Sequence, residues 1–359
     1  MKTSLRTAGL ALALTGALAL AGCGAADPEP AGGTASGTGA VDIGDGKTIE
    51  LPQGDLKIGL FLQSAATAFN QSLLRGAQDA AAKYGYTIEP IDGQFDLNKQ
   101  LNQLQTAATN RTYDVAAVEP LVGASECAAM TRVLPAAGVL VVTTGTPCDT
   151  STKPAGDELW VPGTLATVAG DTTYTYTRAF LQNAIKAFPG AQKVALVTGP
   201  ELDPLVINQK QAVAELAETN PDFDVNFVYT DWTTPKALSA TRDYLSANPD
   251  VTAVLSSFSP DVTRSVVTAM ESVDMLGKVG LADQGATSYS VDQVKNGNMQ
   301  FTLPYFPDEY GRLLVEAVHS AQMGDDVPRF ISNIPDEYGT VEDPVVITRD
   351  NADDFTPRY

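Results

Sequence analysis

Two stretches of the chain share one pattern of predicted strands and helices. Residues 57–119 alternate as strand, helix, strand, helix and strand, and residues 193–255 repeat that order. The strand-like run Lys57–Leu62 recurs as Lys193–Thr198, and the run Asp114–Val118, which closes the first unit, recurs at the same spacing. Two similar α/β units predict two lobes that face each other across a cleft, where proteins of this class bind small molecules.

The first 22 residues have the composition of an export signal. Lys2 and Arg6 come before an apolar run, Ala8–Leu20, that is too short for a comfortable membrane span. The small residues before Cys23 resemble a bacterial lipobox, which implies cleavage before that cysteine and a lipid on its sulfur. An ordinary signal peptide with an incidental cysteine is the alternative. We predict a lipoprotein signal peptide over residues 1–22 and attachment to the extracytoplasmic face of the membrane through the lipid alone.

The remaining chain divides into a linker and a region with regular secondary structure. Residues 23–55 show no apolar period and are rich in Gly, Ala, Thr, Pro and Asp, which predicts a flexible tether. Beyond residue 55, apolar runs alternate with helical patterns, including one long helix expected over 165–188 and a final one over 307–322. This alternation predicts doubly wound parallel sheets with right-handed crossovers, and the length suits two domains.

Two cysteines remain if Cys23 carries a lipid. Cys127 is expected to open the helix after one strand, and Cys148 lies just beyond the next strand. Neighbouring parallel strands lie ~4.8 Å apart, so the two sulfurs could meet above the strand ends. Outside the cell membrane such a pair can oxidise, which predicts a disulfide, with two small buried thiols as the alternative.

A set of short motifs occurs in a fixed order along the chain. The set comprises Lys57–Leu62, Phe69, Gly76-Ala77, Tyr113–Pro120, Val139–Thr144, Asp250–Val254, Val279–Asp283 and Pro307-Asp308. Their order and spacing resemble those of type I periplasmic sugar-binding proteins, the ribose-binding-like solute receptors of ABC importers, over nearly all of residues 56–330. The resemblance implies an α/β fold of two similar lobes, residues 56–161 with 307–326 and residues 162–306 with 327–359. A hinge of three segments would join the lobes and close them on a ligand.

Candidate ligand-binding residues lie where the predicted strands end, because ligands bind beyond the carboxyl ends of strands in such sheets. Aromatic faces can cover the C–H surface of a sugar ring, while amides and carboxylates bind its hydroxyl groups. Each aromatic residue competes with a role in core packing, and each carboxylate with helix capping, above all Asp203 and Asp231. The candidates are Gln63, Thr67, Phe69, Asn70, Asp92, Glu119, Thr144 and Gly145 in the first lobe, and Glu201, Trp232, Phe258, Asp283 and Tyr305 in the second.

The predicted cleft departs from the family pattern in its charge. Where relatives that bind pentoses and hexoses place an Asp-Arg pair, this chain has Gly145 and Thr146, and a second family arginine corresponds to Ile207. A cleft with several acids and no arginine repels an anionic ligand. We therefore expect a small neutral polyhydroxy, sugar-like ligand, or one that bears an amine.

The chain offers little for catalysis, nucleic-acid binding or metal binding. Its formal net charge is −20, and its single histidine, His319, falls in the predicted final helix. No nucleophile elbow, complete dinucleotide fingerprint or complete phosphate-binding loop is present, and we expect no cofactor and no metal site. We predict a monomeric, lipid-anchored solute-binding protein that is not an enzyme and that delivers its ligand to an ABC permease. The alternatives are a receptor for a membrane sensor and an extracellular hydrolase that uses paired carboxylates.

Overall fold

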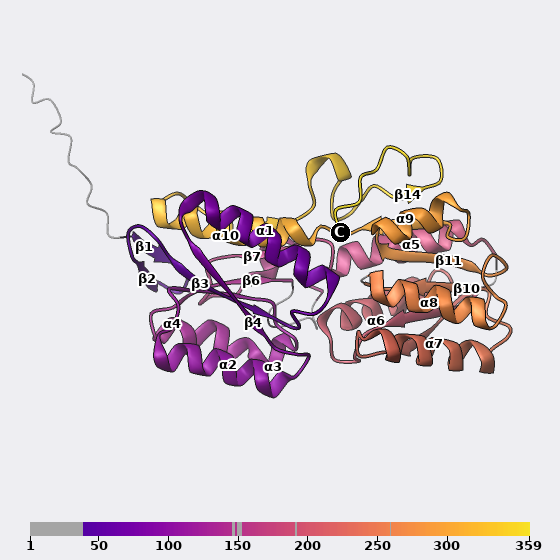
Figure 1. Ribbon diagram of the computed structural model, residues 1–359, viewed down its shortest axis with the longest axis horizontal. Coiled ribbons are helices and arrows are strands. Elements are labelled where there is room, and N and C mark those ends of the chain that lie inside the picture. The colour runs from indigo at the N-terminus through magenta and orange to yellow at the C-terminus, as the bar shows by residue number, and fades with distance from the viewer. Residues whose placement is uncertain (1–38, 146–147, 149–152, 191, 259) are drawn as a thin grey trace, which may run out of the picture. The chain divides into compact units, whose positions relative to one another are not determined.

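The computed structural model describes residues 39–145, 148, 153–190, 192–258 and 260–359 (Figure 1). These residues belong to one compact unit. The predicted signal peptide, the lipidation site Cys23 and the first part of the predicted tether lie outside them.

The first lobe is built on a six-stranded sheet in which every strand is parallel to its neighbours. The strand order is β13-β7-β6-β5-β3-β4. The strands are β3 (Lys57–Leu62), β4 (Thr87–Asp92), β5 (Val115–Val118), β6 (Leu140–Thr144), β7 (Thr167–Ala169) and β13 (Phe330–Ser332). Helices α1 (Ala68–Tyr84) and α10 (Pro307–Met323) cover one face, and α2 (Leu97–Asn110), α3 (Gly123–Ala128), η1 (Ala129–Val133) and α4 (Leu134–Ala136) cover the other (Figure 1).

The second lobe repeats this arrangement with the strand order β14-β12-β11-β10-β8-β9. Its strands are β8 (Gln192–Thr198), β9 (Phe223–Tyr229), β10 (Ala253–Ser256), β11 (Gly280–Gly285), β12 (Phe301–Pro304) and the antiparallel edge strand β14 (Ile347–Thr348). Its helices are α5 (Tyr174–Ala187), α6 (Pro204–Ala217), α7 (Thr234–Ala247), α8 (Pro260–Ser272) and α9 (Ser288–Lys295). Short 3-10 turns, η2 (Gly156–Leu159) and η3 (Asp336–Tyr338), complete the described elements.

The strands at the centre of each sheet are buried on both faces, which is why they appear in the sequence as continuous apolar runs. In β3, Ile58, Leu60 and Leu62 face the core that contains α1 and α10, whereas Phe61 faces the core that contains α2. In β8, Val194 and Leu196 face one core and Ala195 and Val197 the other. Because successive side chains of a strand point to opposite faces of the sheet, each of these strands packs against both helix layers.

Three segments cross between the lobes: from β7 to α5, from β12 to α10, and from β13 to β14. The predicted fold class, two doubly wound parallel-sheet lobes joined by a three-segment hinge, is confirmed.

A single buried carboxylate, that of Asp171, connects the three crossing segments. Its Oδ2 accepts hydrogen bonds from the Phe306 backbone N–H at 2.8 Å and from Asn333 Nδ2 at 2.8 Å. Its Oδ1 accepts one from the Tyr310 hydroxyl at 2.8 Å. Burial raises the pKa of Asp171 to about 6 despite these three donors, because the side chain has no contact with solvent.

Two predicted boundaries are wrong. The tether predicted over residues 23–55 includes an ordered hairpin, β1 (Gly39–Asp42) paired with β2 (Thr48–Leu51). Alternate apolar residues of this hairpin are buried in the core of the first lobe, which explains why it is ordered; they are Val41, Ile43, Ile49 and Leu51.

The second error concerns the first crossing, predicted at residue 162 within a helix expected from 165 to 188. Thr167–Ala169 instead forms β7, which pairs with β6 and with β13, so both β7 and β13 belong to the first sheet. The helix begins only at Tyr174, after the cap residue Thr173. The first crossing therefore follows residue 169, and residues 327–332 belong to the first lobe rather than the second.

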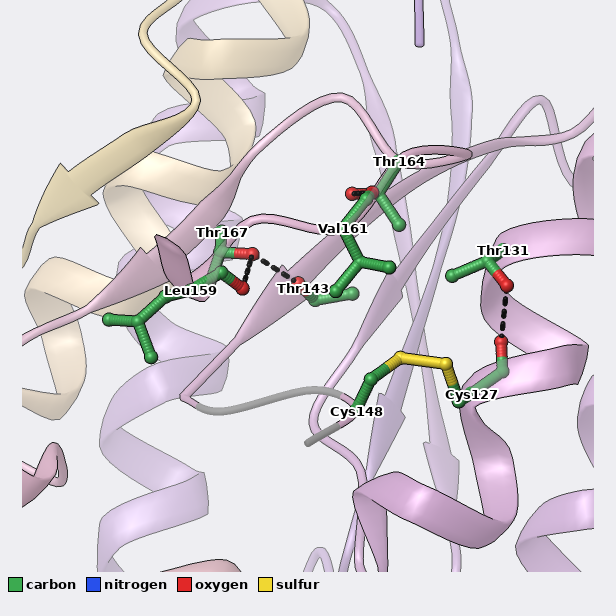
Figure 2. Close-up of a disulfide and its surroundings, with 8 residues drawn as sticks. All are labelled: Cys127, Thr131, Thr143, Cys148, Leu159, Val161, Thr164 and Thr167. Carbon is green, nitrogen blue, oxygen red and sulfur yellow. Dashed lines mark hydrogen bonds between the residues drawn. A yellow bond between two sulfur atoms is a disulfide. The ribbon is translucent and has the colours of Figure 1, made fainter. Parts of the chain in front are cut away.

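Cys127 and Cys148 form the predicted disulfide, with their Cα atoms 5.0 Å apart. Figure 2 shows the bridge between α3 and the segment that follows β6. The Thr131 hydroxyl donates to the Cys127 carbonyl oxygen at 2.8 Å. The disulfide thus links Cys148, four residues beyond the end of β6, to α3.

Within the described residues, none of the helices combines the length and the apolar composition that a bilayer crossing requires. The same part of the chain contains no cluster of His, Cys, Asp and Glu side chains suited to a metal ion.

Candidate functional site

A cavity lies between the carboxyl ends of the strands of the two lobes. It has a volume of about 60 Å³ in this arrangement of the lobes. Its walls come from the segments after β3, β5, β6, β7, β8, β9 and β10, and from helices α1, α6 and α10. The lining residues are Gln63, Phe69, Leu73, Glu119, Pro120, Thr144, Gly145, Thr172 and Tyr310 from the first lobe and its crossings, and Asp203, Pro204, Leu205, Trp232 and Phe258 from the second.

The first lobe contributes a carboxyl group held by the ends of two neighbouring strands. Glu119 Oε2 accepts a hydrogen bond from the Gln63 backbone N–H at 3.0 Å, and Gln63 Nε2 donates to the Pro120 carbonyl oxygen at 2.9 Å. Only 8% of Glu119 is exposed. Burial, reinforced by the charges of Asp203 and Glu126, raises the pKa of Glu119 to about 8.

The second lobe contributes another carboxyl group, Asp203, at the start of α6. Its Oδ1 caps the helix by accepting from the Leu205 backbone N–H at 2.8 Å, and its Oδ2 accepts from Trp232 Nε1 at 3.0 Å. The residue is 5% exposed, and burial raises the pKa of Asp203 to about 6. Asp203 therefore both caps a helix and orients the indole ring of Trp232.

The position of the Trp232 ring requires a glycine beneath it. A Cβ atom at Gly199 would lie 2.0 Å from Trp232 Cε2. Trp232 and Phe258 both have left-handed backbone conformations, with φ of 63° and 65°. Non-glycine residues rarely adopt this conformation, and such residues cluster at binding sites.

Aromatic rings from both lobes meet at the cavity. The ring of Phe69 in α1 lies 4.6 Å from that of Phe258, measured between centroids, and the Trp232 ring lies 5.0 Å from that of Phe258. The Tyr310 ring of α10 is 6.1 Å from Phe69. Tyr305 packs behind these rings, 6.3 Å from Phe69 and 6.0 Å from Phe258.

Seven of the predicted site residues line the cavity: Gln63, Phe69, Glu119, Thr144, Gly145, Trp232 and Phe258. Their contact with ligand stays a prediction, but the structure brings them to one place because each follows or closes a strand, or lies in the first turn of α1.

The other predicted first-lobe residues have structural roles outside the cavity lining. Thr67 caps α1 by accepting from the Asn70 backbone N–H at 3.1 Å. Asn70 is buried and donates from Nδ2 to the Ser64 carbonyl oxygen at 2.7 Å. Asp92 shapes the loops after β3 and β4, because its Oδ1 accepts from the backbone N–H groups of Ala65 at 2.9 Å and Gln94 at 3.0 Å.

The remaining second-lobe predictions also lie outside the lining. Glu201 is exposed and pairs with Lys210 at 2.6 Å. Asp283 is buried and accepts a hydrogen bond from Thr263 Oγ1 at 2.8 Å, and another from Ser290. Tyr305 is only 1% exposed and forms part of the wall behind Phe69 and Phe258.

Seven lining residues were not predicted as ligand-binding residues: Leu73, Pro120, Thr172, Asp203, Pro204, Leu205 and Tyr310. Thr172 falls inside the helix expected over residues 165–188, so the sequence did not indicate that it follows a strand. Leu73 and Tyr310 lie on helices, about one turn after the motif residues Phe69 and Pro307-Asp308. The rule that ligands bind beyond the ends of strands does not select residues on helices. Asp203, which the sequence assigned to capping, caps α6 and lines the cavity as well.

Two doubly wound lobes with one cavity between their strand ends define a ligand-binding protein of the interlobe type. A family model, the periplasmic binding protein domain, matches residues 58–326, and the chain belongs to this family. It is therefore a binding protein rather than an enzyme, as predicted. No match to the chain is found among curated proteins.

Solved structures support the same fold. An ABC transporter solute-binding protein from Mycobacterium smegmatis with bound glycerol has a TM-score of 0.70 and 20% identity, over 84% of this chain and 96% of that one. The Caulobacter myo-inositol binding protein bound to myo-inositol has a TM-score of 0.69 and 20% identity, over 83% and 95%. A solute-binding protein from Agrobacterium vitis with bound D-fucose has a TM-score of 0.70 and 18% identity, over 83% and 97%. At these identities the likeness establishes the fold alone.

Proposed function

We propose that the protein is a lipid-anchored extracytoplasmic solute-binding protein of an ABC importer. In this proposal it captures a small neutral polyhydroxy or amine-bearing ligand in the cavity between its lobes. The observation that carries the proposal is that both lobes line one cavity, with Phe69 and Phe258 in contact across it. A ligand that contacts residues of both lobes stabilises their closed arrangement.

The chemistry of the lining supports this ligand class. Aromatic and apolar side chains supply surface for C–H groups, and Glu119, Asp203 and Thr144 supply hydrogen-bond acceptors. No lysine, arginine or histidine belongs to the lining in the described part of the chain. A phosphate or carboxylate ligand would therefore meet two acids without a compensating cation. The similar structures named above hold neutral polyhydroxy compounds, which agrees with this charge argument.

The proposed anchor and partner follow from the sequence. A lipid on Cys23 would keep a monomeric receptor beside an ABC permease in the membrane, on the extracytoplasmic face, and the acidic composition argues against nucleic acid as a partner. Mass spectrometry of the N-terminal peptide from the membrane fraction tests the anchor: a diacylglycerol mass on Cys23 is expected. An unmodified Cys23, or cleavage elsewhere, would contradict it.

Ligand binding is tested by native mass spectrometry of the purified protein, followed by a thermal-shift panel of sugars, polyols, amines, sugar acids and sugar phosphates. A ligand at one hundred times its dissociation constant adds about 2.7 kcal/mol to the unfolding free energy. Phe258→Ala is expected to abolish this stabilisation, whereas Tyr229→Ala, at an exposed aromatic residue of β9, keeps it. Stabilisation by sugar acids or phosphates alone would refute the proposed ligand class.

A further inference from the structure

The two acids of the cavity have no basic partner among its described lining residues. Glu119 reaches it from the first lobe and Asp203 from the second, and the described lining residues include no lysine, arginine or histidine. Burial disfavours the ionised form of both side chains and raises the pKa of each. A positively charged group in the cavity would supply the missing countercharge.

The hydrogen-bond donors of the lining are largely committed to protein acceptors. Trp232 Nε1 donates to Asp203 at 3.0 Å, and the Tyr310 hydroxyl donates to Asp171 at 2.8 Å. Gln63 Nε2 donates to the Pro120 carbonyl oxygen at 2.9 Å. When a bound cation ionises Glu119 and Asp203, the cavity presents mainly acceptors, and it then favours a ligand that donates hydrogen bonds.

The aromatic rings suit a compact head group better than a sandwiched sugar ring. The centroids of Phe69 and Phe258 are 4.6 Å apart, whereas a ring stacked between two others needs about 7 Å, two van der Waals contacts of ~3.5 Å. A ligand therefore fits beside these rings unless the lobes separate. A cation within about 6 Å of an aromatic centroid is attracted to the ring, most strongly when it is removed from water.

We propose that the ligand is a small organic cation whose ammonium group lies among Phe69, Trp232, Phe258 and Tyr310, with Glu119 and Asp203 as counter-ions. This proposal rests on the proposed function and narrows its ligand class. The rings bind the alkylated or polarised surface of the ammonium group, and the carboxylates balance its charge. The rest of a small ligand faces the apolar side chains of the lining.

The experiment compares cations with neutral molecules of the same shape by isothermal titration calorimetry and thermal shift. One pair is choline and 3,3-dimethylbutan-1-ol, in which carbon replaces the charged nitrogen. The other pair is glucosamine and glucose. In at least one pair the cation is expected to bind at least tenfold more tightly than its neutral partner.

Two variants test the residues assigned to the cation. Glu119→Gln keeps the shape of the side chain and is expected to weaken binding of the cation at least tenfold, with little effect on its neutral partner. Phe258→Leu keeps an apolar side chain without a ring and is expected to reduce the preference for the cation. Glu271→Gln, at an exposed acid of α8, serves as the matched control and leaves both affinities unchanged.

The outcomes separate this inference from the proposed function. If glucose or another neutral polyol binds and neither cation binds more tightly than its neutral partner, the proposal of a cationic ligand is wrong. The solute-binding proposal then still stands. Equal cation affinity in wild type and Glu119→Gln also overturns the cation site. If none of the four compounds binds and no small molecule co-purifies, both proposals fail.

Discussion

Replacement of Asp171 by alanine should weaken the connection between the lobes more than any exposed substitution. Asp171 lies in the first crossing segment and accepts hydrogen bonds from the other two: from the Phe306 backbone N–H and the Tyr310 hydroxyl of the second, and from Asn333 Nδ2 of the third. Asp171→Ala leaves one buried N–H of Phe306 and one of Asn333 without an acceptor, although Asn333 Nδ2 still donates to the Phe306 carbonyl oxygen at 3.3 Å and the Tyr310 hydroxyl keeps a contact with Thr172 at 3.1 Å. At about 1–3 kcal/mol for each unsatisfied buried group, the expected loss of unfolding free energy is about 2–6 kcal/mol.

The measurement is urea unfolding of the ligand-free protein, followed by far-UV circular dichroism at pH 5. At that pH the carboxyl group, whose pKa burial raises to about 6, is largely protonated in the folded state. The loss then reports hydrogen bonds rather than the cost of burying a charge. Asp171→Asn keeps one acceptor oxygen and should lose less than half as much. Asp243→Ala, at an exposed position of α7, is the matched control.

An unfolding free energy of Asp171→Ala within 1 kcal/mol of wild type, with an unchanged dependence on urea, would refute the role of Asp171. A separation of the single transition into two would support it, because the lobes would then unfold independently.

Three further predictions concern the cavity and its surroundings. The Glu119 pKa is raised from 4.5 to about 8, so the folded state holds the proton more tightly and wild-type stability falls as pH rises through that window. Glu119→Gln should therefore gain stability relative to wild type between pH 5 and pH 8 in urea titrations, and a constant difference would contradict the assignment. Cys127→Ser opens the disulfide, whose cysteines are 21 positions apart in sequence, and should cost about 3 kcal/mol; reductant should reproduce the loss in wild type but not in the variant. Gly199→Ala places a methyl group against the Trp232 ring and should cost about 1–3 kcal/mol and weaken ligand binding, whereas unchanged affinity would show that the ring position is unimportant.

The strands at the centre of each sheet could be predicted because burial on both faces leaves a strong sequence signal. Lys57–Leu62 and its counterpart around Lys193 form β3 and β8, at equivalent places in the two sheets. Strand β7 has only three residues and lies close to a long helix, so its signal merged with the helical pattern. The hairpin at residues 39–51 alternates apolar and polar residues, which is a pattern typical of strands. The small and polar residues around it favoured the interpretation as a flexible tether.

The site could be predicted only as far as strand ends define it. That rule identifies the correct edge of each sheet but does not tell which side chains are buried, so Asp283 and Tyr305 were selected although both are buried and neither lines the cavity. Leu73 and Tyr310 enter the cavity from helices that the three-dimensional packing brings over the sheet edge. Their role depends on how α1 and α10 cross the sheet, which no local pattern encodes.

The chain has two tryptophans, and their different positions in the structure allow one of them to report ligand binding by its fluorescence. Trp232 lines the cavity, while the indole N–H of Trp160 donates to the Thr164 carbonyl oxygen in the first lobe at 3.0 Å. A Trp160→Phe variant would leave one emitting side chain, placed where a guest molecule arrives. Rapid-mixing measurements of its emission would then follow capture and release in real time, with no attached dye and no labelled solute.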